Sequence, residues 1–233
     1  MGKLSELKST FVRTTRGRAP SIKMYSLGEE LLNAITHGLG ALFGVAGAAY
    51  LIVFTSLFCD AWSIVSASIY GGSLIILYTM STLYHALTNE TAKKVFRVFD
   101  HSTIFLLIAG TYTPYTLVTI REEGIWGWLV FGVVWGSAVV GITFNAISVE
   151  KFKKLSMILY IASGWAAVLA MMPIIRNLAP NGLWLMLLGG IFYTGGIVFY
   201  KMKHKKYFHG IWHLFVLAGS VSHFFSILFY VYQ

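Results

Sequence analysis

The amino-acid sequence predicts an all-α protein, a bundle of seven helices that cross a membrane. Apolar residues make up 57% of its 233 residues and charged residues only 12%, whereas soluble domains carry about a quarter charged residues. Seven windows are almost free of charge, and each reaches the roughly 20 residues that one helical crossing needs. Their apolarity is continuous rather than alternating, which favours helices over β-strands. We therefore expect a multi-pass protein of the cell membrane.

The seven windows follow one another with short links. In chain order they are Leu31–Cys59, Ala61–Asn89, Val98–Ile120, Gly124–Val149, Leu155–Ile175, Asn177–Tyr200 and Tyr207–Gln233. The third window contains Asp100, the only acidic residue inside any of them. Small residues such as Gly40 and Gly44 let helix backbones approach closely in membranes. Pro114 and Pro173 also lie inside windows, where neighbouring helices can satisfy the carbonyl groups that a proline leaves free.

The basic residues predict the orientation of the bundle. Every Lys and Arg except Arg121 and Arg176 falls in the N-terminal tail or in alternate links, at 93–97, 151–154 and 201–206. Cytoplasmic loops carry the excess of Lys and Arg in membrane proteins. We therefore expect a cytoplasmic N-terminus and an extracytoplasmic C-terminus.

The same pattern of charges predicts two regions of the chain and the class of molecule that it binds. Residues 1–30 are predicted to form a basic cytoplasmic tail, and residues 31–233 the membrane domain. The net charge of +9 then belongs to loops beside the membrane, so a lipid is the expected partner and nucleic acid is not. Cys59 is the only cysteine, which excludes an internal disulfide and a metal site built from cysteines.

Three histidines are predicted to meet near the cytoplasmic interface. His85 lies near the end of the second window, and the seventh window begins with His209 and His213 in the run HGIWH. A spacing of four residues places two imidazoles on one helical face, about 6 Å apart along the axis. Three imidazoles at one depth suit a Zn²⁺ site with one open coordination position for water.

Two further polar residues are expected beside these histidines. Asp100 enters the third window at the same depth, and a buried carboxylate is costly unless it is paired. A metal site would satisfy it. Ser81 lies one helical turn from His85. The sequence thus predicts His85, His209 and His213 as metal ligands, with Asp100 and Ser81 as catalytic residues.

Each of these features also has a simpler interpretation. A lone His-x-x-x-His pattern is a weak signal, because histidines at an interface often bind only a carbonyl group or a lipid headgroup. Asp100 could pair with Arg97 or Lys94 across one helical turn, and Ser81 could bond to a carbonyl of its own helix. The agreement of three separate windows on one depth favours the metal site.

The remaining histidines give weaker indications. His204 lies in a basic link and is expected to be solvated, and His223 is about 15 Å deeper in the membrane than His213. We expect a structural role for His37, and His101 is expected to point about 100° away from Asp100. Several tryptophans, Trp212 among them, are expected to act as interface anchors.

The ordered set of motifs resembles the hemolysin III family, the bacterial branch of the progestin and adipoQ receptor superfamily. The resemblance runs from about Glu29 to Tyr230. It rests on the runs Glu29–Gly40, Ser81–His85, Phe99–Ser102, Gly110–Pro114 and His209–His213.

The resemblance implies seven helices and a cytoplasmic N-terminus. It further implies zinc held by His85, His209 and His213, with Asp100 and Ser81 beside the metal-bound water. The superfamily is similar to alkaline ceramidases, which implies a hydrolase that acts on a lipid amide or ester.

Three functions remain open on the sequence. The first is a zinc-dependent intramembrane hydrolase that opens to the inner leaflet and acts on a membrane lipid. The second is a non-catalytic, receptor-like sensor or membrane-homeostasis protein in which zinc ties helices together. The third is the cytolysin that the family name suggests, although we find neither a signal peptide nor enough polar residues to line a pore.

Overall fold

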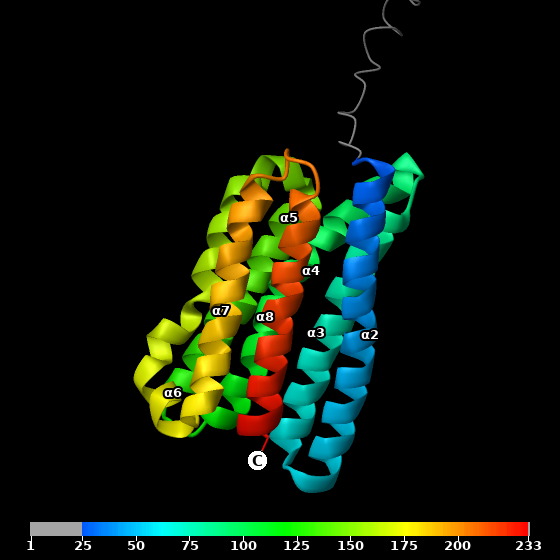
Figure 1. Cartoon of the computed structure of the whole chain (residues 1–233). Helices are drawn as coiled ribbons and strands as arrows, with labels where there is room; N and C mark the ends of the chain where they lie inside the picture. The colour runs from blue at the N-terminus through cyan, green and yellow to red at the C-terminus, as the bar shows by residue number, and fades with distance from the viewer. Residues whose placement is uncertain (1–24, 233) are drawn as a thin grey trace, which may run out of the picture.

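The computed structural model describes residues 25–232, and within this range every regular element is helical. Figure 1 shows long helices that lie side by side along one common direction. The elements are α2 (Leu27–Phe58), α3 (Ala61–Ala86), α4 (Glu90–Pro114), η1 (Tyr115–Thr119), α5 (Trp126–Gly164), η2 (Ala166–Ala170), α6 (Met171–Asn177), α7 (Pro180–Lys201) and α8 (Phe208–Tyr230). Of these, η1 is a π-helical turn and η2 a 3₁₀ turn.

Local sequence signals set where these helices begin. Before α2, the backbone N–H of Ser26 donates to Glu29 Oε2 at 3.0 Å, as part of a capping box. The Asp60 carboxylate accepts a bond of 2.9 Å from the backbone N–H of Ser63 at the start of α3. Such caps satisfy N–H groups that have no partner inside the helix.

Five helical segments among the described residues are long and apolar enough to cross a membrane. They are Leu27–Phe58, Ala61–Ala86, Trp126–Asn177, Pro180–Lys201 and Phe208–Tyr230. Their outward faces carry many exposed aliphatic and aromatic side chains, as expected where lipid is the solvent. The prediction of an all-helical, multi-pass membrane protein is confirmed, whereas the count of seven crossings and the orientation stay predictions.

Helix α5 accounts for part of the difference between seven windows and five segments. It covers 39 residues, but Ser148 has an extended backbone (φ −169°, ψ 108°) that breaks the helix into two parts. The Ser148 hydroxyl oxygen lies 3.3 Å from the backbone N of Lys151, the contact of an N-cap. Most of the two predicted windows Gly124–Val149 and Leu155–Ile175 therefore falls within the single segment Trp126–Asn177.

Helices pack closely where glycines face a neighbour. The Tyr78 ring of α3 occupies the space that a side chain at Gly40 of α2 would need, and a Cβ at Gly47 would lie 2.7 Å from Phe224 of α8. These contacts confirm the close-approach role expected for small residues. They hold α2 against α3 and α8 within the bundle.

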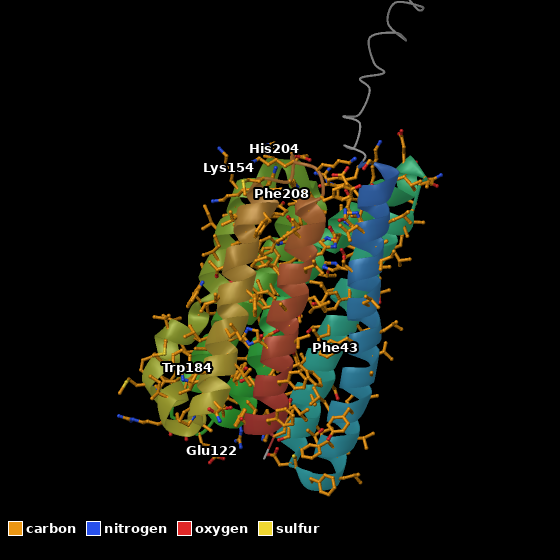
Figure 2. All side chains as sticks on the ribbon, in the orientation of Figure 1. Phe43, Glu122, Lys154, Trp184, His204 and Phe208 are labelled. Carbon is orange, nitrogen blue, oxygen red and sulfur yellow. The ribbon has the colours of Figure 1, made fainter. Side chains whose placement is uncertain are left out.

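The two ends of the bundle differ in charge. Lys154 and His204 lie at the end where α2 begins, whereas Glu122 lies at the opposite end (Figure 2). The chain leaves α8 at that opposite end (Figure 1). The basic links therefore share one end of the molecule with the start of α2.

Candidate metal centre

The three predicted histidine ligands meet between α3 and α8. His85, in the last turn of α3, and His209 and His213, in the first two turns of α8, are all buried. Their candidate ligand atoms lie within 4.8 Å of one another. The Nε2 atoms of His85 and His209 are 3.3 Å apart. These three imidazoles can hold a metal ion.

The hydrogen bonds around two of the rings leave a nitrogen facing this centre. His213 Nδ1 lies 3.2 Å from the carbonyl oxygen of Asn33 and 3.3 Å from the hydroxyl of Thr36, and its Nε2 has no partner within the described residues. His85 Nδ1 lies 2.7 Å from Glu30 Oε2. When Nδ1 carries the proton, the Nε2 lone pair is free for a metal. The donor set fits Zn²⁺, which imidazole suits well.

Sequence reasoning missed Glu30 and Lys93. Glu30 belongs to the predicted cytoplasmic tail and Lys93 to a predicted basic link, yet Lys93 Nζ donates to Glu30 Oε1 at 2.7 Å. The Lys93 side chain is only 1% exposed. The spacing of Glu30, Asn33 and His37 on one helix was the available signal, because i, i+3 and i+7 share a face.

Asp100 is buried in the same region, but its predicted alternative partners do not bind it. Its Oδ2 lies 3.4 Å from Nδ1 of His101, so the expectation that His101 faces elsewhere is wrong. The same Nδ1 lies 3.1 Å from the Arg97 carbonyl oxygen, one helical turn back. Arg97 instead pairs with Glu150 of α5.

Ser81 lies beside Asp100, and its hydroxyl makes no hydrogen bond of ordinary geometry within the described residues. The bond to a carbonyl of its own helix, the simpler interpretation, is therefore not formed. A buried hydroxyl without a partner costs free energy. It is available to a molecule that enters the site.

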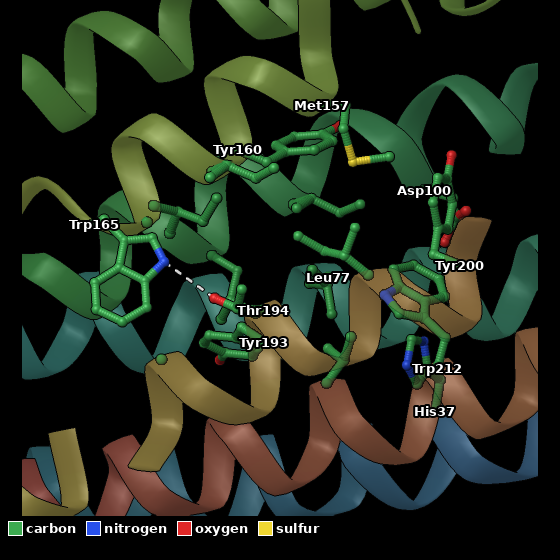
Figure 3. A pocket seen from close by; sticks show the side chains of 18 residues that line it. His37, Leu77, Asp100, Met157, Tyr160, Trp165, Tyr193, Thr194, Tyr200 and Trp212 are labelled. Atoms are coloured by element: carbon green, nitrogen blue, oxygen red, sulfur yellow. Dashed lines mark hydrogen bonds between the residues drawn. The ribbon is translucent and has the colours of Figure 1, made fainter. Parts of the chain in front are cut away.

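A largely apolar cavity lies inside the bundle, with His37 and Asp100 among its lining residues (Figure 3). The space between its lining residues is about 940 Å³ when the open solvent at its mouth is counted. Asp100 and His37 lie at one end, and Trp165 and Thr194 lie at the other (Figure 3). There the Trp165 indole N–H donates to the Thr194 hydroxyl at 3.1 Å.

Aromatic rings surround the histidines. The Tyr25 ring stacks on His209 with centroids 5.1 Å apart, and Trp212 lies 5.0 Å from His209. Trp212 also lines the cavity, so it is not the simple interface anchor that the sequence suggested. His204 is exposed as expected, and His223 contacts Tyr115 and Tyr193 rather than the three histidines.

Comparison with known proteins confirms the family resemblance. Residues 25–224 match the family described as Haemolysin-III related. The chain is 42% identical over 207 residues to the Hemolysin-3 homolog of Bacillus subtilis (strain 168), which covers 89% of this chain and 96% of the relative. It is 43% identical over 203 residues to Hemolysin-3 of Bacillus cereus, which covers 87% of this chain and 92% of the relative.

A more distant relative comes from animals. The human Monocyte to macrophage differentiation factor is 29% identical over 234 residues, which covers 97% of this chain and 95% of the relative. The match thus extends over the helices that supply all three histidines. This chain belongs to the haemolysin-III related family of integral membrane proteins.

Proposed function

We propose that this protein is a zinc-dependent intramembrane hydrolase that acts on a lipid amide or ester. The observation that carries the proposal is one arrangement of groups. Three buried imidazoles able to hold a metal stand next to Asp100 and His37, which line the polar end of an otherwise apolar cavity. An amphiphile that enters this cavity brings its polar group to the histidines and leaves its hydrocarbon against apolar walls.

His85, His209 and His213 would hold the ion. Zn²⁺ bound there supplies Lewis acidity that polarises a carbonyl group. The Asp100 carboxylate takes a proton from the attacking water and later returns it to the leaving group, as a general base and then a general acid. The Ser81 hydroxyl, which lies beside Asp100, donates a hydrogen bond that orients the water or the developing oxyanion.

The proposal includes seven crossings with the histidines at the cytoplasmic side. Helix α5 has 39 residues, about 58 Å at 1.5 Å per residue, nearly twice the 30 Å hydrocarbon core. Its break at Ser148 supports two crossings instead of one. Helix α4 supplies another, with its charged first turns outside the hydrocarbon. The basic links at the end where α2 begins support a cytoplasmic placement of that end.

A second candidate is a sensor in which the metal has no catalytic part. The observation that favours it is that the histidines join separate helices: α3 and α8 supply the rings, and α2 supplies their partners Glu30 and Asn33. A metal in such a place ties the bundle together. The names of the Bacillus relatives add lysis of membranes as a third candidate.

One experiment separates these candidates. Purified protein in vesicles that contain a ceramide and a phospholipid is assayed for bound zinc and for released fatty acid, alongside His213→Ala. If the protein is a hydrolase, we expect about one zinc per chain and release of fatty acid, and we expect His213→Ala to abolish that release. Zinc without turnover of any lipid supports the sensor. Leakage of vesicles made only from non-hydrolysable ether lipids supports direct lysis.

A further inference from the structure

Glu30 joins three helices at the edge of the histidine cluster. It lies in the first turns of α2, and its two carboxylate oxygens have different partners. Oε2 lies 2.7 Å from Nδ1 of His85 on α3, and Oε1 lies 2.7 Å from Nζ of Lys93 on α4. The side chains are 0%, 1% and 12% exposed for His85, Lys93 and Glu30. The contacts are therefore shielded from water, and each is a hydrogen bond to a charged acceptor.

This arrangement selects one tautomer of His85. A carboxylate can only accept hydrogen bonds, so the proton of the neutral imidazole must sit on Nδ1. The Nε2 lone pair then points at His209, whose Nε2 is 3.3 Å away. Asn33 Nδ2 lies 3.4 Å from the same Nδ1, a longer and weaker contact than that of the carboxylate.

Lys93 completes the arrangement by balancing the charge of Glu30. A buried carboxylate without a partner would be costly, and a buried ammonium equally so. Lys93 Nζ also donates to the Leu87 carbonyl oxygen at 3.3 Å and lies 5.1 Å from the centre of the Tyr84 ring. Two of its partners therefore lie beside His85 in sequence, so Lys93 fixes the chain on both sides of that residue.

We propose that Glu30 and Lys93 are positioning residues for the metal, which act through His85 and set the affinity of the histidine cluster. The inference rests on the metal site of the proposed function but not on its catalysis. Partners that orient a metal-ligating histidine typically contribute 10–100-fold in metal affinity. A pair that only tied α2 to α4 would contribute to stability and leave metal affinity unchanged.

The test measures zinc affinity by competition with a chelator, and the thermal midpoint of the metal-free protein, for four proteins in the same detergent. They are the wild type, Glu30→Gln, Glu29→Gln and the double variant Glu30→Leu/Lys93→Met. Glu29 is the matched control, because it is the neighbouring carboxylate and bonds Ser26 and the Tyr207 backbone instead of a histidine. The double variant replaces the whole ion pair by apolar groups, which often preserves the fold.

We expect Glu30→Gln and the double variant to bind zinc about 10–100-fold more weakly than the wild type, and Glu29→Gln to stay within about twofold of it. Wild-type affinity in a folded double variant would overturn the inference, and so would an equal loss in Glu29→Gln. A wild type that binds no zinc overturns this inference and the proposed function together. Zinc binding that depends on Glu30, in a protein that hydrolyses no lipid, supports this inference and overturns only the hydrolase.

Discussion

The ring of His37 lies parallel to the ring of His213, with centroids 3.5 Å apart and planes 9° apart. His37 comes from α2 and His213 from α8. Neither nitrogen of His37 has a hydrogen-bond partner within the described residues, yet the ring lines the cavity. Buried polar atoms without partners call for an explanation. A polar group of a bound lipid would supply one.

His37→Phe keeps a ring that can stack on His213 and removes both nitrogens. We expect the variant to retain zinc and to lose about tenfold in lipid hydrolysis, the effect of roughly one hydrogen bond at 1.4 kcal/mol per factor of ten. Metal analysis and fatty acid release are measured together. Full turnover in His37→Phe would show that the ring is only a packing element.

We predict that substitutions within the histidine cluster remove the metal, whereas substitution of an exposed histidine does not. His85→Ala and His209→Ala each remove one of three nitrogen ligands, so zinc should fall from about one per chain to near zero after dialysis against a weak chelator. The exposed His204 provides the control, and His204→Ala should keep its zinc. Stoichiometric zinc in His85→Ala would exclude this cluster as the metal site.

Asp100→Asn tests the proton-transfer role separately from metal binding. The amide has a similar shape but cannot accept a proton at neutral pH, so we expect hydrolysis to fall by about 10²–10⁴-fold. The metal content should remain that of the wild type, because Asp100 is not among the three predicted ligands. A variant that hydrolyses lipid at the wild-type rate would contradict the assignment.

Gly40→Ala tests the packing of α2 on α3. A Cβ at this position collides with the ring of Tyr78, which is fully buried and donates to the Ser220 hydroxyl at 2.7 Å. We expect a loss of about 1–3 kcal/mol of stability, read as a lower unfolding midpoint in detergent. Gly72→Ala is the control, since nothing lies within 4 Å of a Cβ there. Equal midpoints for both variants would argue against the close approach.

The position of Lys203 leads us to predict how the stability of the folded protein depends on pH. It lies in the link between α7 and α8, where burial, together with Lys153 and Arg97, lowers the pKa of its ammonium from 10.5 to about 8. The unfolded chain then binds more protons than the folded one between these values, so stability should rise as the pH increases from about 8 to 10.5. Unfolding midpoints at pH 7, 8 and 9 measure this rise, and Lys203→Met should reduce it. An identical pH profile in the variant would exclude Lys203 as the cause.

The part of the site that the sequence could predict depends on spacing within single helices and on the depth at which separate windows begin or end. His209 and His213 are four residues apart, so one helical repeat places them on the same face. Asp100 stands out because carboxylates are rare inside membrane helices. The all-helical fold class could be predicted from the composition and from the continuous apolar windows. None of these inferences needed a contact between distant segments.

The parts that the sequence could not predict depend on packing between helices. Glu30 and Lys93 are 63 residues apart, and each lies where a charged residue is ordinarily solvated. Only the packing of α2 against α3 and α4 reveals that their charges are buried together. The sequence separates two windows at 150–154, next to the break at Ser148. It does not mark Ser148 itself, because serine is common within membrane helices.

Trp212 gives the molecule an optical reporter of its own. It is one of seven tryptophans, and its ring lies 5.0 Å from His209 and 5.2 Å from His213 while also lining the cavity. Indole emission responds to charge and polarity within such distances. Occupation of the histidine cluster and filling of the cavity therefore both act on the fluorescence of one native side chain, and a titration can follow them without an attached dye.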